Sequence, residues 1–269
     1  MKRDDVVLIT GASAGIGEAL AVELSSRGLR TALLARRTDR TERLAARLGG
    51  DARSLAIACD VTVEGALDEA VALTLQRFGR IDAVVANAGF GVDGALARLS
   101  LDDYRRQFET NVFGVLRTAM ATRAPLAATR GVFAAVGSVS AYVSAPGASA
   151  YNMSKGAVRS LCETLNAEWA PAGVAVVHIA PGFVSSEIRK VDRKGQLREG
   201  AKDPVPGWLQ LSAEAAAREI ADALSARRAE AVITGHGKAL VWLSRRAPAV
   251  LRQLLKLMAR QARPSKGEG

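Results

Sequence analysis

Val6-Val7-Leu8-Ile9-Thr10-Gly11-Ala12-Ser13-Ala14-Gly15-Ile16-Gly17 joins an apolar run to a glycine-rich turn and to the start of a helical pattern. Val6–Thr10 has the composition of a buried strand, and Gly11, Gly15 and Gly17 follow it. Glycine is needed where a strand turns sharply into a helix and where backbone approaches a phosphate closely. The next helix offers free N–H groups and the positive end of its dipole to an anion. The stretch therefore predicts a phosphate-binding loop, although its spacing matches neither the G-x-G-x-x-G fingerprint nor a P-loop.

Short apolar runs alternate with longer helical patterns along the rest of the chain. The runs are continuously apolar, which is typical of parallel strands covered on both faces. This alternation predicts an α/β fold with a doubly wound, mostly parallel seven-stranded sheet and helices on both faces. The predicted strands are Val6–Thr10, Arg30–Ala35, Ser54–Cys59, Ala83–Ala86, Gly131–Val136, Ala175–Ile179 and Ala231–Thr234. The clearest helical patterns cover Gly15–Arg27, Glu64–Phe78 and Tyr151–Trp169.

The overall composition excludes several classes of protein. The 269 residues are 49% hydrophobic and 24% charged, which excludes a wholly disordered chain, a collagen and a disulfide-stapled miniprotein. Cys59 and Cys162 are the only cysteines and read as core residues of a protein in a reducing compartment. No apolar run reaches the roughly 18 residues of a membrane span, and no signal-peptide pattern is present. We expect a cytoplasmic location and leave membrane association open.

Positive charge is concentrated in the last third of the chain. Residues 1–188 hold 20 Lys+Arg and 19 Asp+Glu, a net charge of +1, whereas residues 189–269 hold 17 and 8, a net charge of +9. On a helical wheel of Pro248–Arg263, apolar side chains share one arc and basic side chains the opposite one. Such a helix fits peripheral contact with a membrane, but it also fits packing over a substrate cleft or a subunit interface. No motif for reading nucleic acid accompanies the charge.

Two further motifs accompany the glycine-rich loop. Asn87-Ala88-Gly89 follows the fourth predicted strand, and Tyr151 is followed by Lys155 at the start of a helical pattern. Together with the T-G-x-x-x-G-x-G pattern of Thr10–Gly17, these motifs resemble the short-chain dehydrogenase/reductase family over roughly Val6–Ile233. The resemblance implies a Rossmann-like fold, oxidoreductase activity and a nicotinamide cofactor.

Tyr151 and Lys155 lie at i and i+4, one turn apart on one face of a predicted helix. A nearby ammonium favours the phenolate and lowers the phenol pKa, which suits Tyr151 to donate and accept a proton near neutral pH. The resemblance implies that Ser138 orients the reacting oxygen, that Lys155 also holds the nicotinamide ribose, and that Asn111 supports a water-based proton relay. The predicted catalytic residues are therefore Asn111, Ser138, Tyr151 and Lys155.

The end of the second predicted strand bears on the choice of cofactor. An acidic residue at this position binds the adenosine ribose hydroxyls, whereas arginine suits a 2′-phosphate. This chain has Ala35 there, followed by Arg36 and Arg37, whose guanidinium groups can make charge-assisted bonds to phosphate. We therefore expect NADP(H) rather than NAD(H). The alternative interpretation is that Arg36 and Arg37 are solvated surface charges that do not bind the cofactor.

The resemblance places further residues around the cofactor. It puts Asp60 near the adenine, and Ser186 stands where the family usually has threonine. The predicted cofactor-binding residues are Gly11, Ser13, Gly15, Ile16, Gly17, Arg36, Arg37, Asp60, Val61, Asn87, Ala88, Gly89, Tyr151, Lys155, Pro181, Gly182, Val184 and Ser186. His178 lies in an apolar run and reads as structural. No metal site is expected.

The sequence thus predicts an NADP(H)-dependent oxidoreductase that interconverts a carbonyl and an alcohol on a hydrophobic small molecule. A 3-oxoacyl thioester reductase and a non-catalytic NADP(H)-binding module are the alternatives. The expected organisation is a catalytic domain over 1–238, with a substrate lid at about 183–211 where periodicity is lost, and a basic amphipathic extension over 239–269. The resemblance also implies a homodimer or homotetramer built on the helices that contain Asn111 and Tyr151.

Overall fold

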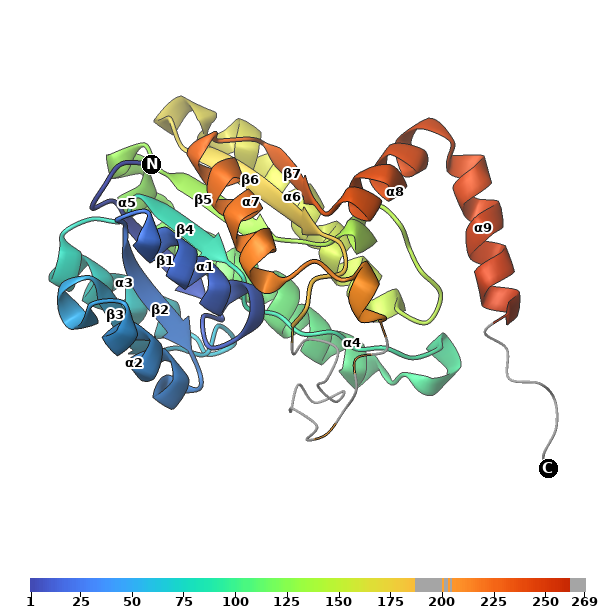
Figure 1. Cartoon of the computed structure of the whole chain (residues 1–269), viewed down its shortest axis with the longest axis horizontal. Helices are drawn as coiled ribbons and strands as arrows, with labels where there is room; N and C mark the ends of the chain where they lie inside the picture. The colour runs from blue at the N-terminus through green and yellow to red at the C-terminus, as the bar shows by residue number, and fades with distance from the viewer. Residues whose placement is uncertain (187–199, 201–202, 204, 262–269) are drawn as a thin grey trace.

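A seven-stranded, entirely parallel sheet lies at the centre of the computed structural model, which describes residues 1–186, 200, 203 and 205–261 (Figure 1). The strands follow the order β3-β2-β1-β4-β5-β6-β7, so the order reverses where β1 lies between β2 and β4. This confirms the predicted doubly wound α/β fold. The strands are β1 (Val6–Thr10), β2 (Arg30–Ala35), β3 (Ser54–Ala58), β4 (Ala83–Ala86), β5 (Val132–Val136), β6 (Ala175–Pro181) and β7 (Glu230–Ile233).

The observed strands differ from the predicted ones only at their ends. β6 continues two residues beyond the prediction, because Pro181 still pairs with Ile233 although it has no N–H group to donate. β7 starts at Glu230, which lies opposite His178, and it ends before Thr234. Thr234 instead has a positive φ and accepts a hydrogen bond from the Gly237 backbone at the start of the next helix.

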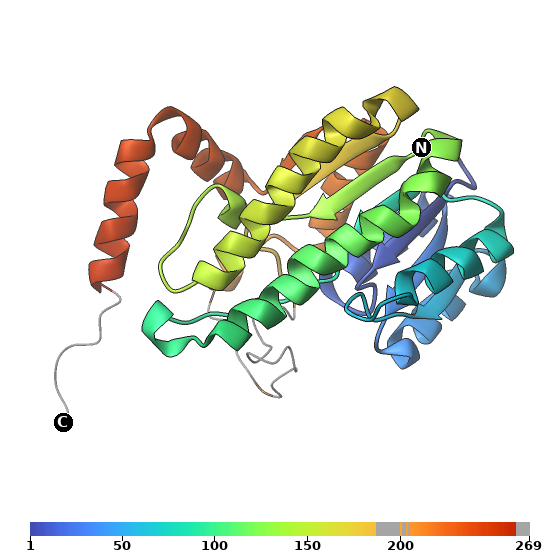
Figure 2. The same cartoon turned by 180° about the vertical axis from the view of Figure 1, so that it is seen from behind.

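Helices cover both faces of the sheet (Figures 1 and 2). α1 (Gly15–Ser26), α2 (Thr38–Arg47) and α7 (Ala213–Ser225) pack on one face. α3 (Ala66–Phe78), α5 (Gly114–Thr129) and α6 (Ser149–Trp169) pack on the other. The continuous burial of β1 and β5 follows from this double covering. Cys59 and Cys162 are both buried and free, as the sequence predicts.

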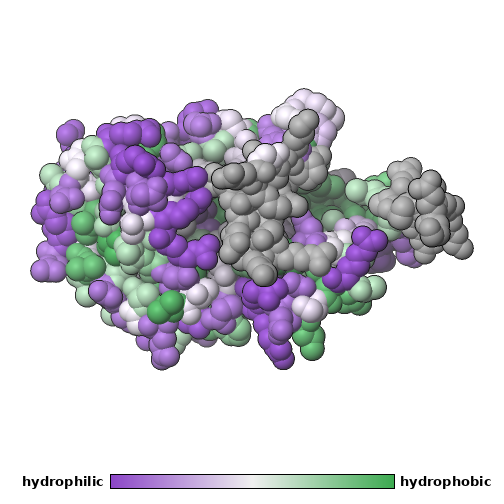
Figure 3. All heavy atoms as spheres, turned by 90° about the horizontal axis from the view of Figure 1, so that it is seen from below, coloured by the Kyte–Doolittle hydropathy of each residue, from purple (hydrophilic) through white to green (hydrophobic). Residues whose placement is uncertain are grey.

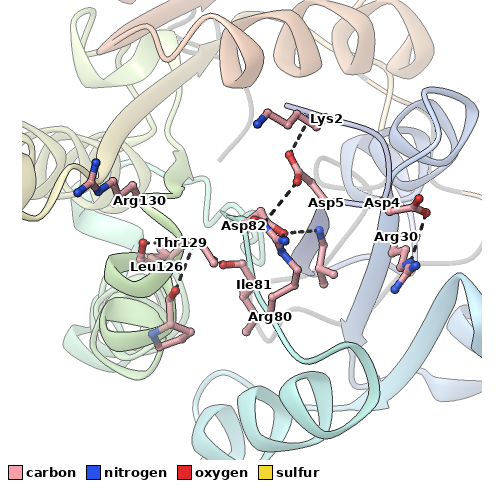
Figure 4. Close-up of polar contacts among 12 residues, drawn as sticks. Lys2, Asp4, Asp5, Arg30, Arg80, Ile81, Asp82, Leu126, Thr129 and Arg130 are labelled. Carbon is pink, nitrogen blue, oxygen red and sulfur yellow. Dashed lines mark hydrogen bonds and ion pairs between the residues drawn. The ribbon is translucent and has the colours of Figure 1, made fainter.

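Polar contacts tie the strands together at the amino edge of the sheet, opposite the glycine-rich loop (Figure 4). The buried Asp82 carboxylate, just before β4, accepts a 2.8 Å hydrogen bond from the Val6 backbone at the start of β1 and is also bonded by Arg80. Thr129, at the end of α5, donates a 2.8 Å hydrogen bond to the Ile81 carbonyl. These contacts fix β1 and β4 next to each other, and the opposite ends of the same two strands form the cavity described below.

Two helices follow β7 and project beyond the sheet (Figures 1 and 2). α8 covers Gly235–Arg246 and α9 covers Pro248–Gln261. Pro248 therefore opens the helix that the sequence predicts, whereas residue 239, the proposed start of the extension, lies inside α8. Most of the proposed lid at 183–211 lies outside the described residues. At its two ends, Val184 forms an isolated parallel bridge with Leu211.

Candidate active site

A cavity of about 640 Å³ opens at the carboxyl ends of β1, β2, β4, β5 and β6, a volume typical of cofactor and ligand pockets. Parallel strands place their following loops at one edge of the sheet, and the reversal of strand order between β1 and β4 opens a crevice there. The predicted residues that line the cavity are Gly11, Ser13, Gly15, Ile16, Arg36, Arg37, Asp60, Val61, Asn87, Ala88, Gly89, Ser138, Tyr151, Lys155, Pro181, Gly182, Val184 and Ser186. Two predicted residues, Gly17 and Asn111, do not line it.

The glycine-rich loop needs its glycines for different reasons. Gly11 and Gly15 have φ values of +66° and +59°, in the left-handed region that favours glycine. A Cβ on Gly17 would lie 2.4 Å from the Gly11 carbonyl oxygen. Gly17 therefore allows the first turn of α1 to pack directly on the loop, and Gly17 itself does not line the cavity. Ala14, the N-cap residue of α1, makes no side-chain cap. The N–H groups of this first turn are thus open to an anion such as a cofactor pyrophosphate.

Thr10 connects this loop to the loop after β4. Its buried hydroxyl accepts hydrogen bonds of 3.0 Å from the backbone N–H groups of both Asn87 and Ala88. The Asn87 side chain in turn donates to the carbonyl oxygens of Thr10 and Gly11 at 3.0 and 3.1 Å. Asn87 therefore fixes the shape of the phosphate loop through its amide, a role that a turn motif alone does not reveal. Thr10 belongs to the glycine-rich motif but is not among the predicted site residues.

The two arginines after β2 both line the cavity, next to the small, buried Ala35. The Arg37 guanidinium donates a 3.1 Å hydrogen bond to the Ser13 hydroxyl in the glycine-rich loop. The Arg36 side chain is 67% exposed, and its Nη1 lies 4.0 Å from the Asp60 carboxylate. Asp60 also accepts hydrogen bonds from the backbone and side chain of Thr62. This end of the cavity thus holds two cations and one carboxylate.

Tyr151, Lys155 and Ser138 line the same cavity. Lys155 is buried, and its Nζ donates a 2.8 Å hydrogen bond to the Val136 carbonyl at the end of β5. Its Nζ also lies 5.6 Å from the Tyr151 ring centroid. Burial disfavours the charged amine and lowers the pKa of Lys155 to about 8. The Ser138 hydroxyl accepts a 3.0 Å hydrogen bond from the Ser140 backbone, which leaves its own hydrogen free to donate into the cavity.

Asn111 lies behind this centre, in a π-helical turn (Glu109–Phe113) between α4 (Leu101–Phe108) and α5. It is fully buried, and its side-chain amide exchanges hydrogen bonds with the backbone N–H and carbonyl of Phe90. Its Nδ2 also lies 3.2 Å from the Ser154 hydroxyl on α6. A Cβ on Gly89 would lie 3.1 Å from Asn111 Oδ1 and 3.7 Å from Lys155 Nζ. A side chain at position 89 would therefore crowd the Asn111 amide.

The segment after β6 is held by a residue that the sequence analysis missed. His236 Nε2, in the first turn of α8, accepts a 3.0 Å hydrogen bond from the Phe183 backbone N–H. The two rings stack with centroids 5.4 Å apart. A Cβ on Gly182 would lie 2.3 Å from Thr234 Oγ1 and 2.5 Å from His236 Nε2. No sequence signal points to His236, because the contact joins residues that are 53 positions apart.

A polar cluster of Tyr142, Glu230, Arg245 and His178 lies next to the Ser138 loop. The Tyr142 hydroxyl donates to the Glu230 carboxylate and lies 3.1 Å from His178 Nδ1, while Arg245 bonds both Glu230 oxygens at 2.8 and 2.7 Å. Burial lowers the pKa of His178 to about 4, so this histidine is neutral. The geometry fits the structural role that the sequence predicts for His178.

The described residues add two findings on metals and membranes. Among them, no three His, Cys, Asp or Glu side chains come together as a possible metal site. None of the helices in the described ranges is both long enough and apolar enough to span a bilayer. The cavity also has lining residues that are not among the predicted site residues, namely Ala14, Ala35, Cys59, Thr62, Phe90, Arg106, Glu109, Thr110, Val136 and Gly137.

Comparisons with known proteins agree with this geometry. A family model described as short chain dehydrogenase matches residues 5–197. An 11-beta-hydroxysteroid dehydrogenase A of Sesamum indicum is 31% identical over 268 residues, which covers 94% of this chain and 75% of the relative. An alcohol dehydrogenase from the archaeon Thermococcus sibiricus, solved in complex with 5-hydroxy-NADP, superposes with a TM-score of 0.75 at 30% identity and covers 86% of this chain and 96% of its own.

A 3-ketoacyl-(acyl-carrier-protein) reductase from Brucella melitensis, solved in complex with NADH, superposes with a TM-score of 0.76 at 27% identity. The match covers 87% of this chain and 98% of that structure. Both solved relatives therefore share nearly the whole fold and hold a nicotinamide nucleotide. The chain belongs to the short-chain dehydrogenase family of nicotinamide-dependent oxidoreductases.

Proposed function

We propose that this chain is an NADP(H)-dependent oxidoreductase that interconverts a carbonyl and an alcohol on a hydrophobic small molecule. The observation that carries the proposal is that Tyr151, Lys155 and Ser138 line the same cavity as the glycine-rich loop. A residue that exchanges a proton and a loop suited to a pyrophosphate serve one reaction when they share one cavity. The relatives from Sesamum indicum and Thermococcus sibiricus, named as dehydrogenases, support the same reaction type.

The residues of this chain have distinct roles in the proposed reaction. When bound, the nicotinamide supplies or accepts the hydride. The Ser138 hydroxyl donates a hydrogen bond to the substrate oxygen and orients it, and the Tyr151 hydroxyl gives that oxygen its proton during reduction. The Lys155 ammonium, 5.6 Å from the Tyr151 ring, favours the phenolate that remains. Asn111 acts at one remove, because its amide fixes the Phe90 backbone and Ser154 next to these residues.

The preference for NADP(H) rests on the end of β2. Ala35 offers no carboxylate to bind ribose hydroxyls or to repel a phosphate, while Arg36 and Arg37 bring two guanidinium groups to the cavity wall. Arg37 is oriented by its bond to Ser13, and the largely exposed Arg36 is free to swing onto a 2′-phosphate. Asp60, 4.0 Å from Arg36, weakens the positive field without removing it. The residues present therefore fit the phosphorylated nucleotide better than NAD(H).

A 3-oxoacyl thioester reductase is the second candidate. The similarity to the 3-ketoacyl reductase of Brucella melitensis favours it, as does the basic C-terminal third of the chain, which would attract an acidic acyl carrier. We also propose a homodimer or homotetramer built on α5 and α6. Phe113, Met120 and Met153 expose apolar side chains on these helices and on the π-helical turn before them. Light scattering after gel filtration measures the subunit number.

The test is oxidation of NADPH with a panel of aldehydes, ketones and 3-oxoacyl thioesters, on the wild type and on Tyr151→Phe. Loss of a positioned acid–base group costs about 10²- to 10⁴-fold in turnover, so we expect that loss with an unchanged Kd for NADPH. Tyr104→Phe is the matched control, because its hydroxyl bonds Ser149 rather than facing the cavity. NADPH binding with no turnover on any substrate would leave the non-catalytic binding module as the answer.

A further inference from the structure

Helices α8 and α9 form an arm, residues 235–261, that leaves the body of the protein after β7 (Figures 1 and 2). Unlike α1, α2, α3, α5, α6 and α7, the arm covers neither face of the sheet. Large apolar side chains are exposed along it, with exposed fractions between 45% and 63%. They are Trp242, Val250, Leu254, Leu257 and Met258.

The exposed apolar residues of α9 form one stripe. Val250, Leu254, Leu257 and Met258 follow the spacing i, i+4, i+7 and i+8, which places them on one side of a helix. Leu251 lies at the edge of this stripe and is buried in a small core with Val139, Val143 and Val241. The arm is therefore fixed to the loop that follows Ser138 by one edge of its apolar face, and the rest of that face is uncovered.

The charge of the arm has a single sign. Residues 235–261 contain six Lys and Arg side chains and no Asp or Glu. Two of the six are paired with the body, Lys238 with Glu219 and Arg245 with Glu230. Arg246, Arg252 and Lys256 are exposed and make no ion pair within the described ranges. On α9, Arg252 and Lys256 lie one turn apart on the side opposite the apolar stripe.

We propose that the arm docks the protein on an anionic membrane surface. The apolar stripe would enter the boundary between headgroups and acyl chains, the basic side chains would bind anionic headgroups, and Trp242 would lie at the interface that tryptophan prefers. Figure 3 shows hydrophobic residues beside the grey atoms at its right-hand end.

Other occupants fit the arm less well. A second copy that paired through the apolar stripe would cover that stripe but would leave Arg252 and Lys256, on the opposite side of α9, without a partner. Nucleic acid would neutralise the cations, but its phosphate backbone offers nothing to Trp242, Leu254 or Leu257. An anionic bilayer satisfies both the charge and the apolar stripe. Val241 and Leu251 of the arm pack with Val139 and Val143, which follow Ser138. Docking would therefore hold the Ser138 loop, and with it the cavity, close to a membrane that dissolves hydrophobic molecules.

The test is sedimentation of the full chain with vesicles of phosphatidylcholine alone or mixed with phosphatidylserine. We expect at least about tenfold stronger binding to the phosphatidylserine vesicles at low salt, falling as salt rises to about 0.5 M, because salt screens exposed charges. Leu254→Asp/Leu257→Asp and Arg252→Glu/Lys256→Glu should each reduce this binding about tenfold. All four side chains are exposed, so NADPH affinity and thermal unfolding should match those of the wild type.

Matched variants elsewhere on the surface separate this site from general stickiness. Val63→Asp removes an equally exposed apolar side chain, and Arg47→Glu/Arg123→Glu reverses two exposed charges outside the arm, so both should bind vesicles like the wild type. Equal binding to neutral and anionic vesicles, or no binding to either, would overturn the proposal. So would a change of subunit number in Leu254→Asp/Leu257→Asp, which would make the stripe a subunit interface. The measurement needs no substrate and is independent of the proposed reaction.

Discussion

Two parts of the cavity wall are held together in different ways: the loops after β1 and β4, where we propose that the nucleotide binds (the nucleotide end), and the region around Tyr142 and β7 (the C-terminal side). Around β1 and β4, side chains bond to backbone: Thr10 and Asn87 lock two neighbouring loops, and Gly17 lets a helix touch one of them. On the C-terminal side, distant side chains bond to each other, as when Tyr142 meets Glu230, which Arg245 also binds. The first region depends on short local motifs, whereas the second depends on contacts that form only in the folded chain.

Gly17→Ala should have the largest effect on stability, because the added Cβ would lie 2.4 Å from a backbone oxygen that cannot move away. Forcing an extra methyl group into a packed site costs about 1–3 kcal/mol, and we expect a value near the upper end with weakened NADPH binding. Gly156→Ala is the matched control, since its Cβ would meet nothing within 4 Å. Chemical denaturation with a cofactor titration measures both. If the two variants behave alike, the nucleotide end is less tightly packed than described.

Acid should weaken the C-terminal side through His178. Its pKa falls to about 4 in the folded protein, because burial disfavours the charged ring, whereas it is about 6.5 when exposed. Between these values the unfolded chain binds a proton that the folded chain does not, so stability rises with pH and is lost as pH falls from 6.5 toward 4. The loss between pH 6.5 and 4.5 should be about 2 kcal/mol.

Denaturation curves at a series of pH values on the wild type and on His178→Asn isolate this contribution. Other groups titrate over the same range in both proteins, so the difference between the two curves belongs to His178 and to the Tyr142 and Glu230 groups bonded around it. Parallel pH dependence in the two proteins would show that His178 takes up its proton without unfolding.

Glu230→Gln should have a smaller effect, of about 1 kcal/mol, because glutamine keeps an acceptor for Tyr142 but loses the charge that Arg245 binds. Arg245 is half exposed, so the lost ion pair alone contributes little. We expect turnover to fall with Ser138 mispositioned, while the Kd for NADPH stays unchanged. An altered Kd with normal turnover would place the influence of this cluster at the nucleotide end instead.

Local patterns predicted the sheet and most of the cavity. The strands and the glycine-rich loop could be found because continuous burial and helix entry leave short, contiguous patterns. The location of Asn111 could not be predicted in this way, because a π-helical turn places Asn111 behind Gly89 rather than in the cavity. α8 begins with Gly235-His236-Gly237, which resembles a turn, so its start and the role of His236 were missed. Contacts such as that of His236 with Phe183 have no local signature.

The most direct test of the proposed cofactor is a calorimetric titration of NADPH and NADH into the wild type, Arg36→Ala and Arg37→Ala. Both arginines line the cavity, and Arg36 is 67% exposed, so its removal should change stability by less than about 0.5 kcal/mol. We predict that NADPH binds at least about tenfold more tightly than NADH, and that Arg36→Ala removes most of this difference while NADH affinity is unchanged. Tighter binding of NADH, or a preference for NADPH that survives both substitutions, would contradict this assignment of the arginines.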